Sequence, residues 1–279
     1  DLAWAAGDSQ ARGFLIGATS GRTTLNGEGL QHQDGHSHLQ AQTIPNCVSY
    51  DPTYSYELAV IIQDGLRRMY LERENRFYYI TTMNENYPHP EMPAGAEEGI
   101  IRGMYRLRRS PREEGPRVQL MGAGAILREV EAAAELLASN YGVAADIWSV
   151  TSVNELARDG RACHRWNRLN PEQEPRVPYL AQLLEGADGP AILATDYITP
   201  YGEQLRAYMP RPYTVLGTDG FGRSDTRAKL RQFFEVSREF IAFAALGALA
   251  AEGAIEPAKV AEARRDLGID PDKIDPMLA

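Results

Sequence analysis

The sequence predicts an α/β fold in which a mostly parallel sheet is flanked by helices. Short apolar or β-branched runs alternate with longer amphipathic runs, and strands separated by helices pair in parallel through right-handed crossovers. Hydrophobic residues make up 43% of the 279 residues, which is enough for a sizeable core and argues against disorder. At about 150 residues per domain, this length predicts roughly two domains or one large one.

The first part of the chain contains three strand-like runs and one long helix. Asp51 and Pro52 are expected to open this helix, as cap and first helical residue, and the helical spacing continues to about Tyr70. The last strand-like run reads RFYYITT, which is rich in aromatic and β-branched residues. The expected strands cover residues 13–18, 46–50 and 76–82, and the expected loops cover residues 19–40 and 84–93.

A second βα series follows a charged segment that contains Pro and Gly, residues 106–116, which we interpret as a linker. The sequence therefore predicts one domain over residues 1–105 and another over residues 117–279. In the second domain the expected strands cover residues 118–121, 147–150, 191–195 and 214–217. The expected helices cover residues 126–141, 151–157 (a short helix), 240–251 (a buried helix) and 257–267.

Composition narrows the class of protein. A net charge of −9 and a pI of about 5.2 argue against a protein that coats nucleic acid or an anionic membrane. No run approaches the roughly 20 apolar residues of a membrane-spanning helix. Two cysteines do not make a disulfide framework, which favours a cytoplasmic location. The chain opens at Asp1 without an initiator Met, and the first part has few strands, so we expect a fragment of a longer polypeptide.

The densest group of candidate functional residues is a Gly-rich loop in which three of the five histidines lie within seven residues: His32, His36 and His38. Loops on an α/β frame commonly carry functional sites, and histidine can donate, accept or shuttle a proton near neutral pH. Three interpretations remain open here. The loop could bind a metal, although it has no Cys partner; it could be a catalytic lid; or its histidines could satisfy local backbone groups.

Two further Gly-rich turns follow predicted strands. Residues 121–125 (MGAGA) resemble the start of a dinucleotide fingerprint, but the third glycine is missing, which favours a tight strand-to-helix turn. Residues 217–224 lie where parallel sheets often bind ligands, yet their composition favours an ordered turn before a helix. No phosphate-binding P-loop and no G-x-S-x-G nucleophile motif is present.

Long motifs along the whole chain resemble the E1 component of the pyruvate dehydrogenase complex, homodimeric bacterial type, within the transketolase-like superfamily. The matching runs are GRTTLNGEGLQH (21–32), DGHSH (34–38), IPNC (44–47), YITT (79–82), NENY (84–87), GAEEG (95–99), SVTS (149–152), ELARDG (155–160), RVPY (176–179) and LGTDGFGRS (216–224). The resemblance implies that residues 1–105 are the last part of a pyrimidine-binding middle domain and that a transketolase C-terminal-like domain follows.

The same resemblance implies a catalytic role for the histidine loop. His38 would face the reacting carbon and contact substrate, His36 would be its catalytic neighbour, and Asp34 would orient the loop or contact substrate. The implied cofactors are thiamine diphosphate and Mg²⁺. The family's GDG-type metal motif is absent from these residues, so we expect no metal ligand here and the main cofactor ligands upstream of Asp1.

The implied reaction is the decarboxylation of pyruvate with thiamine diphosphate as electron sink, followed by reductive acetylation of the lipoyl group of an E2 dihydrolipoyl acetyltransferase. The implied assembly is a homodimer within a multienzyme complex. Two alternatives stay open: an isolated fragment that acts only as a structural or dimerisation module, and an E1 for a different 2-oxo acid. In either case we expect this segment alone to be inactive, because cofactor-binding parts are missing.

Overall fold

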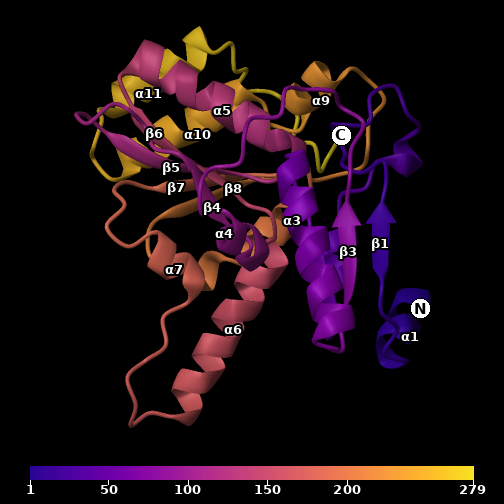
Figure 1. Ribbon diagram of the computed structural model, residues 1–279. Coiled ribbons are helices and arrows are strands. Elements are labelled where there is room, and N and C mark those ends of the chain that lie inside the picture. The colour runs from indigo at the N-terminus through magenta and orange to yellow at the C-terminus, as the bar shows by residue number, and fades with distance from the viewer.

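The computed structural model describes residues 1–279 and contains two sheets (Figure 1). The smaller sheet has the order β1-β3-β2, with β1 (Phe14–Gly17), β2 (Cys47–Tyr50) and β3 (Phe77–Thr81) all parallel. The elements around it are α1 (Leu2–Asp8), η1 (Leu30–His32), α2 (Ser37–Gln42), α3 (Ser55–Leu66), η2 (Arg67–Leu71) and α4 (Glu97–Arg102).

The larger sheet has the order β4-β6-β5-β7-β8. Its strands are β4 (Tyr105–Arg108), β5 (Arg117–Gly122), β6 (Ala144–Ser149), β7 (Ala191–Ala194) and β8 (Tyr213–Leu216). Only β4 is antiparallel, where it pairs with β6 at the edge of the sheet. The prediction of an α/β fold with mostly parallel sheets is confirmed.

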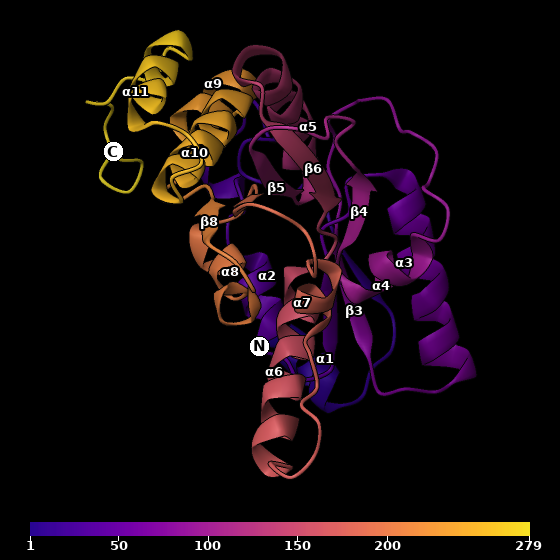
Figure 2. The ribbon, with the colours of Figure 1, turned by 90° about the vertical axis from the view of Figure 1, so that its left-hand side faces the viewer.

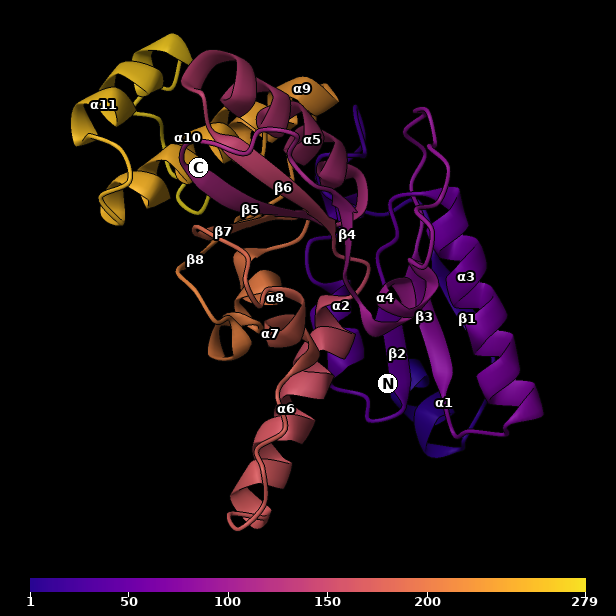
Figure 3. The same ribbon diagram turned by 60° about the vertical axis from the view of Figure 1, so that its left-hand side comes forward.

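Helices cover both faces of the larger sheet (Figures 2 and 3). On one face lie η3 (Gly124–Ile126), α5 (Leu127–Leu136), η4 (Leu137–Tyr141), α9 (Arg227–Phe233), α10 (Arg238–Ala251) and α11 (Pro257–Asp266). On the other lie α6 (Val153–Leu169), α7 (Tyr179–Leu183), α8 (Thr199–Glu203) and η5 (Arg206–Tyr208). The second half of α6 projects away from the sheets. None of the helices is both long and apolar enough to cross a membrane.

Three local expectations differ from the structure. The helix expected at Pro52 begins at Ser55, because the Glu57 carboxylate accepts the N–H groups of Thr53 and Tyr54 and places the helix start there. The short helix expected over 151–157 extends to Leu169; its second half is mostly polar and carries no fully buried residue, so the sequence signal for it is weak.

The expected linker, residues 106–116, also differs from the structure. Its first three residues belong to β4, which pairs with β6, so only residues 109–116 connect the strands. Tyr105 is buried and Leu107 packs against the core, which explains why this charged stretch is held on the sheet edge. The first sheet and the second sheet therefore meet almost directly, through α4 and β4.

Candidate functional site

The segment that follows β1 crosses from the first sheet to the second. Residues 20–25 are buried although most are polar, and Thr23 and Thr24 are at most 1% exposed. Their partner is Asp196, which lies just beyond the carboxyl end of β7. A loop of the first half of the chain is therefore held by the second half.

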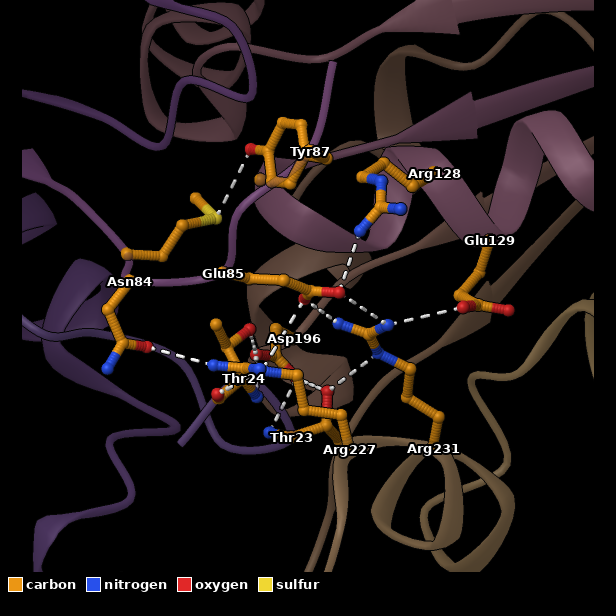
Figure 4. A network of polar contacts seen from close by, with 12 residues as sticks. Thr23, Thr24, Asn84, Glu85, Tyr87, Arg128, Glu129, Asp196, Arg227 and Arg231 are labelled. Atoms are coloured by element: carbon orange, nitrogen blue, oxygen red, sulfur yellow. Dashed lines mark hydrogen bonds and ion pairs between the residues drawn. The ribbon is translucent and has the colours of Figure 1, made fainter. Parts of the chain in front are cut away.

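Asp196 accepts four hydrogen bonds from two successive residues, an arrangement that we call the threonine clasp (Figure 4). Oδ1 accepts the N–H of Thr23 at 2.9 Å and its hydroxyl at 2.6 Å. Oδ2 accepts the N–H of Thr24 at 3.2 Å and its hydroxyl at 2.8 Å. Burial raises the pKa of Asp196, and these hydrogen bonds act against that rise by stabilising the carboxylate.

The clasp lies at the switch point of the larger sheet. After β5 the chain continues to β6 on one side, and after β7 it continues to β8 on the other, so β5 and β7 flank the crevice where open α/β sheets commonly bind ligands. Both strand ends contact the first half of the chain instead. Gly124, after β5, donates its N–H to the Asp51 carbonyl (3.2 Å) and accepts the Thr53 hydroxyl (2.7 Å).

Two glycines make this close approach possible. Gly21 has φ +90°, and a Cβ there would lie 2.2 Å from Oδ2 of Asp196. Gly124 has φ +52°, and a Cβ there would lie 2.4 Å from Oδ2 of Asp51. The turn over 121–125 therefore acts as the tight strand-to-helix turn that the missing third glycine favoured, with its backbone groups already engaged by Asp51 and Thr53.

The turn over 217–224 also holds the histidine loop. The buried Arg22 side chain donates from Nη1 to the Thr218 carbonyl at 2.7 Å and to the Gly220 carbonyl. Its guanidinium lies against Gly35, where a Cβ would be 2.3 Å from Nη2. The Gly35 carbonyl in turn accepts the N–H of Ile198 at 2.9 Å.

A cluster of arginines and glutamates lies beside the clasp (Figure 4). Arg231 is 5% exposed and pairs with Glu85 and with Glu129, the latter at 3.2 Å. Arg227 donates from Nε to the Thr24 carbonyl at 2.8 Å. Because Glu85 comes from the loop after β3, this cluster ties a second loop of the first half to α9.

His36 and Asp34 lie at the outer end of the histidine loop. The side chain of His36 is exposed. The backbone N–H of His36 donates to Oδ1 of Asp34 at 3.0 Å. The same oxygen accepts the N–H of Ser37 at 3.0 Å, and Oδ2 accepts the Ser37 hydroxyl. Asp34 thus organises the first turn of α2 and holds the backbone at His36, while the imidazole of His36 faces outward.

His38 is placed differently from the expectation that it faces a reacting carbon. It lies on α2 with no exposed surface, among the rings of Tyr79, Tyr197 and Tyr201. Burial lowers its pKa to about 4, so the ring is neutral at physiological pH. Its Nε2 lies 3.0 Å from the Thr81 hydroxyl and its Nδ1 has no partner. With no surface open to a substrate, this arrangement lends no support to the expected role.

A buried carboxyl that sequence analysis treated only as a helix cap lies next to His38. The Thr81 hydroxyl donates to Oδ1 of Asp51 at 2.7 Å, which links the two residues through one oxygen atom. Asp51 is 2% exposed, and burial raises the pKa of its carboxyl to about 7. The signal in the sequence was an Asp directly after an apolar strand, but the same pattern also precedes many helices.

No group of three or more His, Cys, Asp or Glu side chains lies together in a way that could hold a metal ion. The three histidines of the loop diverge, since His32 and His36 are exposed and His38 is buried.

Comparison with known proteins gives a consistent assignment along the chain. Residues 1–90 match the model of the pyruvate dehydrogenase E1 component middle domain, and residues 103–237 match the transketolase-like C-terminal domain. The chain is 62% identical over 278 residues to the pyruvate dehydrogenase E1 component of Pseudomonas aeruginosa, covering 99% of this chain and 32% of that protein. It is 60% identical over 281 residues to that of Escherichia coli K12, covering 100% of this chain and 31% of that protein.

The fold is similar to that of solved transketolases. The transketolase of Campylobacter jejuni matches with a TM-score of 0.63 and 17% identity, over 88% of this chain and 33% of that one. The chain spans about a third of the length of the curated relatives it matches. On these matches, the chain belongs to the pyruvate dehydrogenase E1 family and carries sequence of its middle domain followed by a transketolase-like C-terminal domain.

Proposed function

We propose that this chain is part of a cytoplasmic, thiamine diphosphate-dependent E1 that decarboxylates pyruvate and acetylates the lipoyl group of an E2 partner. The observation that carries the proposal is the identity of 60–62% over essentially the whole chain to proteins named pyruvate dehydrogenase E1 component. We further propose that the complete protein is a homodimer. Within the chain, we place the boundary between the two units near residue 103, before β4.

Thiamine diphosphate supplies an electron sink for decarboxylation, and its diphosphate requires Mg²⁺ in the family that the sequence resembles. The residues of this chain form no cluster of three or more His, Cys, Asp or Glu side chains that could hold a metal ion by themselves. We therefore propose that both cofactors are bound mainly by parts of the complete protein that lie outside this chain.

The contribution of this chain is a hydrogen-bond donor held in a fixed place. We propose that His36 is the histidine of the loop that meets substrate, because its imidazole is exposed while its backbone N–H donates to Asp34 and the preceding Gly35 carbonyl accepts the N–H of Ile198. A donor aimed at a developing oxyanion contributes about 3 kcal/mol to transition-state stabilisation. We propose that the neutral His38 fixes α2 by packing among Tyr79, Tyr197 and Tyr201, and that His36, and not His38, faces the reacting carbon.

Replacement of each histidine in the complete E1 tests these assignments. We expect His36→Ala to lower kcat for pyruvate at least about 100-fold, and His32→Ala, an exposed neighbour in the same loop, to leave kcat near the wild-type value. We expect His38→Ala to lower the melting temperature, since it removes a fully buried ring. Near-normal turnover of His36→Ala would remove His36 from the mechanism.

A second test uses the chain by itself. We expect the purified 279-residue chain, mixed with thiamine diphosphate, Mg²⁺ and pyruvate, to release no CO₂ above background. Decarboxylation by the chain alone would show that it binds the cofactors, and would contradict the proposed division of the site. Addition of the missing part in trans, with recovery of activity, would support that division and count against a purely structural module.

A further inference from the structure

Several anchors of the histidine loop lie beyond the carboxyl ends of β7 and β8 in the second sheet. Asp196 follows β7 and holds Thr23 and Thr24 through four hydrogen bonds. Farther along the loop, the Gln33 side chain donates to the Leu25 carbonyl at 2.9 Å and accepts the N–H of Arg223 at 2.7 Å. Residues 26–32, between these anchors, are exposed. The loop is thus held by hydrogen bonds at two places: at Thr23 and Thr24, and at Gln33, directly before Asp34.

The threonine clasp occupies the position where an open α/β sheet commonly holds a ligand. The crevice between β5 and β7 receives the threonine clasp, and the turn after β8 receives Arg22. Asp196 is buried, and its carboxylate is stabilised by the two hydroxyls and two N–H groups of the clasp together with the nearby charge of Arg231, whose Nε donates to the Thr23 hydroxyl at 3.4 Å. Loss of either hydroxyl leaves a buried carboxylate oxygen with one donor fewer.

We propose that the switch-point crevice of the second sheet is a socket that positions the histidine loop, with Asp196, Thr23 and Thr24 as its positioning residues. The second unit then contributes to catalysis without contacting substrate, because it fixes the backbone position of Gly35 and His36. This inference rests on the proposed function for its catalytic consequence. Its structural consequence, a rigid loop over residues 30–38, stands independently of any activity.

The test compares two matched double variants of the complete E1. Thr23→Val with Thr24→Val keeps the side-chain shape and removes both hydroxyl donors, whereas Thr23→Ser with Thr24→Ser keeps both donors. Amide hydrogen exchange over residues 30–38 and steady-state kinetics with pyruvate are measured on each. An exposed control, Thr43→Val, removes a threonine hydroxyl that bonds only the Gln40 carbonyl.

We expect the valine pair to speed exchange over residues 30–38 about tenfold or more, because hydrogen bonds to a buried carboxylate are stronger than those between neutral groups and two of them are lost. We expect kcat and kcat/KM to fall together by about tenfold or more with KM little changed, the pattern of a misplaced transition-state donor. The serine pair is expected to restore both readouts toward the wild type, and Thr43→Val to change neither.

Three results would overturn the proposal: unchanged exchange over residues 30–38 in the valine pair, an equal increase of exchange throughout the protein, or local loosening without a fall in kcat. If the valine pair does not fold, Thr24→Val alone removes one hydroxyl and is expected to show the same local pattern at smaller size. If the wild-type protein does not decarboxylate pyruvate, the proposed function fails, while the exchange measurement still tests the socket.

Discussion

The two sheets of this molecule are stabilised in different ways. The larger sheet is covered on both faces, and its two hydrophobic clusters contain 23 and 17 buried residues. The two clusters around the smaller sheet contain 9 and 4 buried residues, and the edge strand β1 leaves Leu15 and Ile16 46% and 50% exposed. Within residues 1–279, the larger sheet therefore has an apolar core of its own, whereas the smaller one is only partly covered.

The smaller unit gains much of its order from polar contacts with the larger one. Thr23, Thr24, Asp51 and Glu57 are all buried, and each bonds to a residue beyond position 100 or to a neighbour that does. Hydrogen bonds are directional, so such a junction fixes orientation more strictly than apolar packing does. The comparison shows that the apolar core of the larger unit contributes most of the stability, whereas the polar junction fixes the orientation of the smaller unit relative to the larger one.

The largest expected effect separates the two cores directly. Leu120 is fully buried in β5, and we expect Leu120→Ala to lower the free energy of unfolding by about 2–5 kcal/mol. The matched change Leu15→Ala on β1 is expected to cost less than about 1 kcal/mol, because half of that side chain is already exposed. Urea denaturation of both variants measures the difference, and equal losses would show that β1 packs against something further.

The junction is expected to respond to pH through Asp51. Burial raises the pKa of its carboxyl to about 7, above the usual range, so the folded state binds a proton that the unfolded state has released. The folded state therefore loses stability as pH rises toward 7. His38, with its pKa lowered to about 4, acts in the opposite direction between about pH 4 and 6.5.

Asp51→Asn isolates the carboxyl, because His38 is present in both proteins. Between pH 5 and pH 7 we expect the free energy of unfolding of the variant to rise, relative to that of the wild type, by up to about 1.4 kcal/mol per pH unit. Unfolding free energies of the two proteins at pH 5, 6 and 7 provide the measurement. A gap that stays constant over this range would mean that Asp51 is ionised throughout.

The last comparison concerns two glycines. Gly124→Ala at the junction places a Cβ 2.4 Å from the Asp51 carboxylate at φ +52°, so we expect a loss of about 1–3 kcal/mol. Gly247→Ala, in the middle of α10 with nothing within 4 Å, is expected to stabilise by up to about 1 kcal/mol. Melting temperatures should move in opposite directions; a shared direction would contradict the assigned roles.

Most strands were predictable from short apolar runs, and β1, β2, β3, β5, β7 and β8 lie close to the expected residues. The antiparallel β4 was missed because its charged sequence resembles a linker, and only pairing with β6 makes it a strand. The local sequence around Asp196 did not indicate its role, because a single Asp after a strand can cap a helix, form a turn or bind a distant segment. Its role depends on two threonines more than 170 residues away, as the 173-residue separation of Thr23 shows.

Apart from β4, the order of the strands along the chain was determined by the sequence alone, because apolar periodicity is a local property of a few turns or a few alternating residues. Which histidine points outward was decided only by the tertiary structure. His36 and His38 are two residues apart and chemically identical, but Asn154, Tyr197 and Tyr201 enclose only His38. Burial depends on segments that pack from far along the chain, and no local pattern records where those segments will lie.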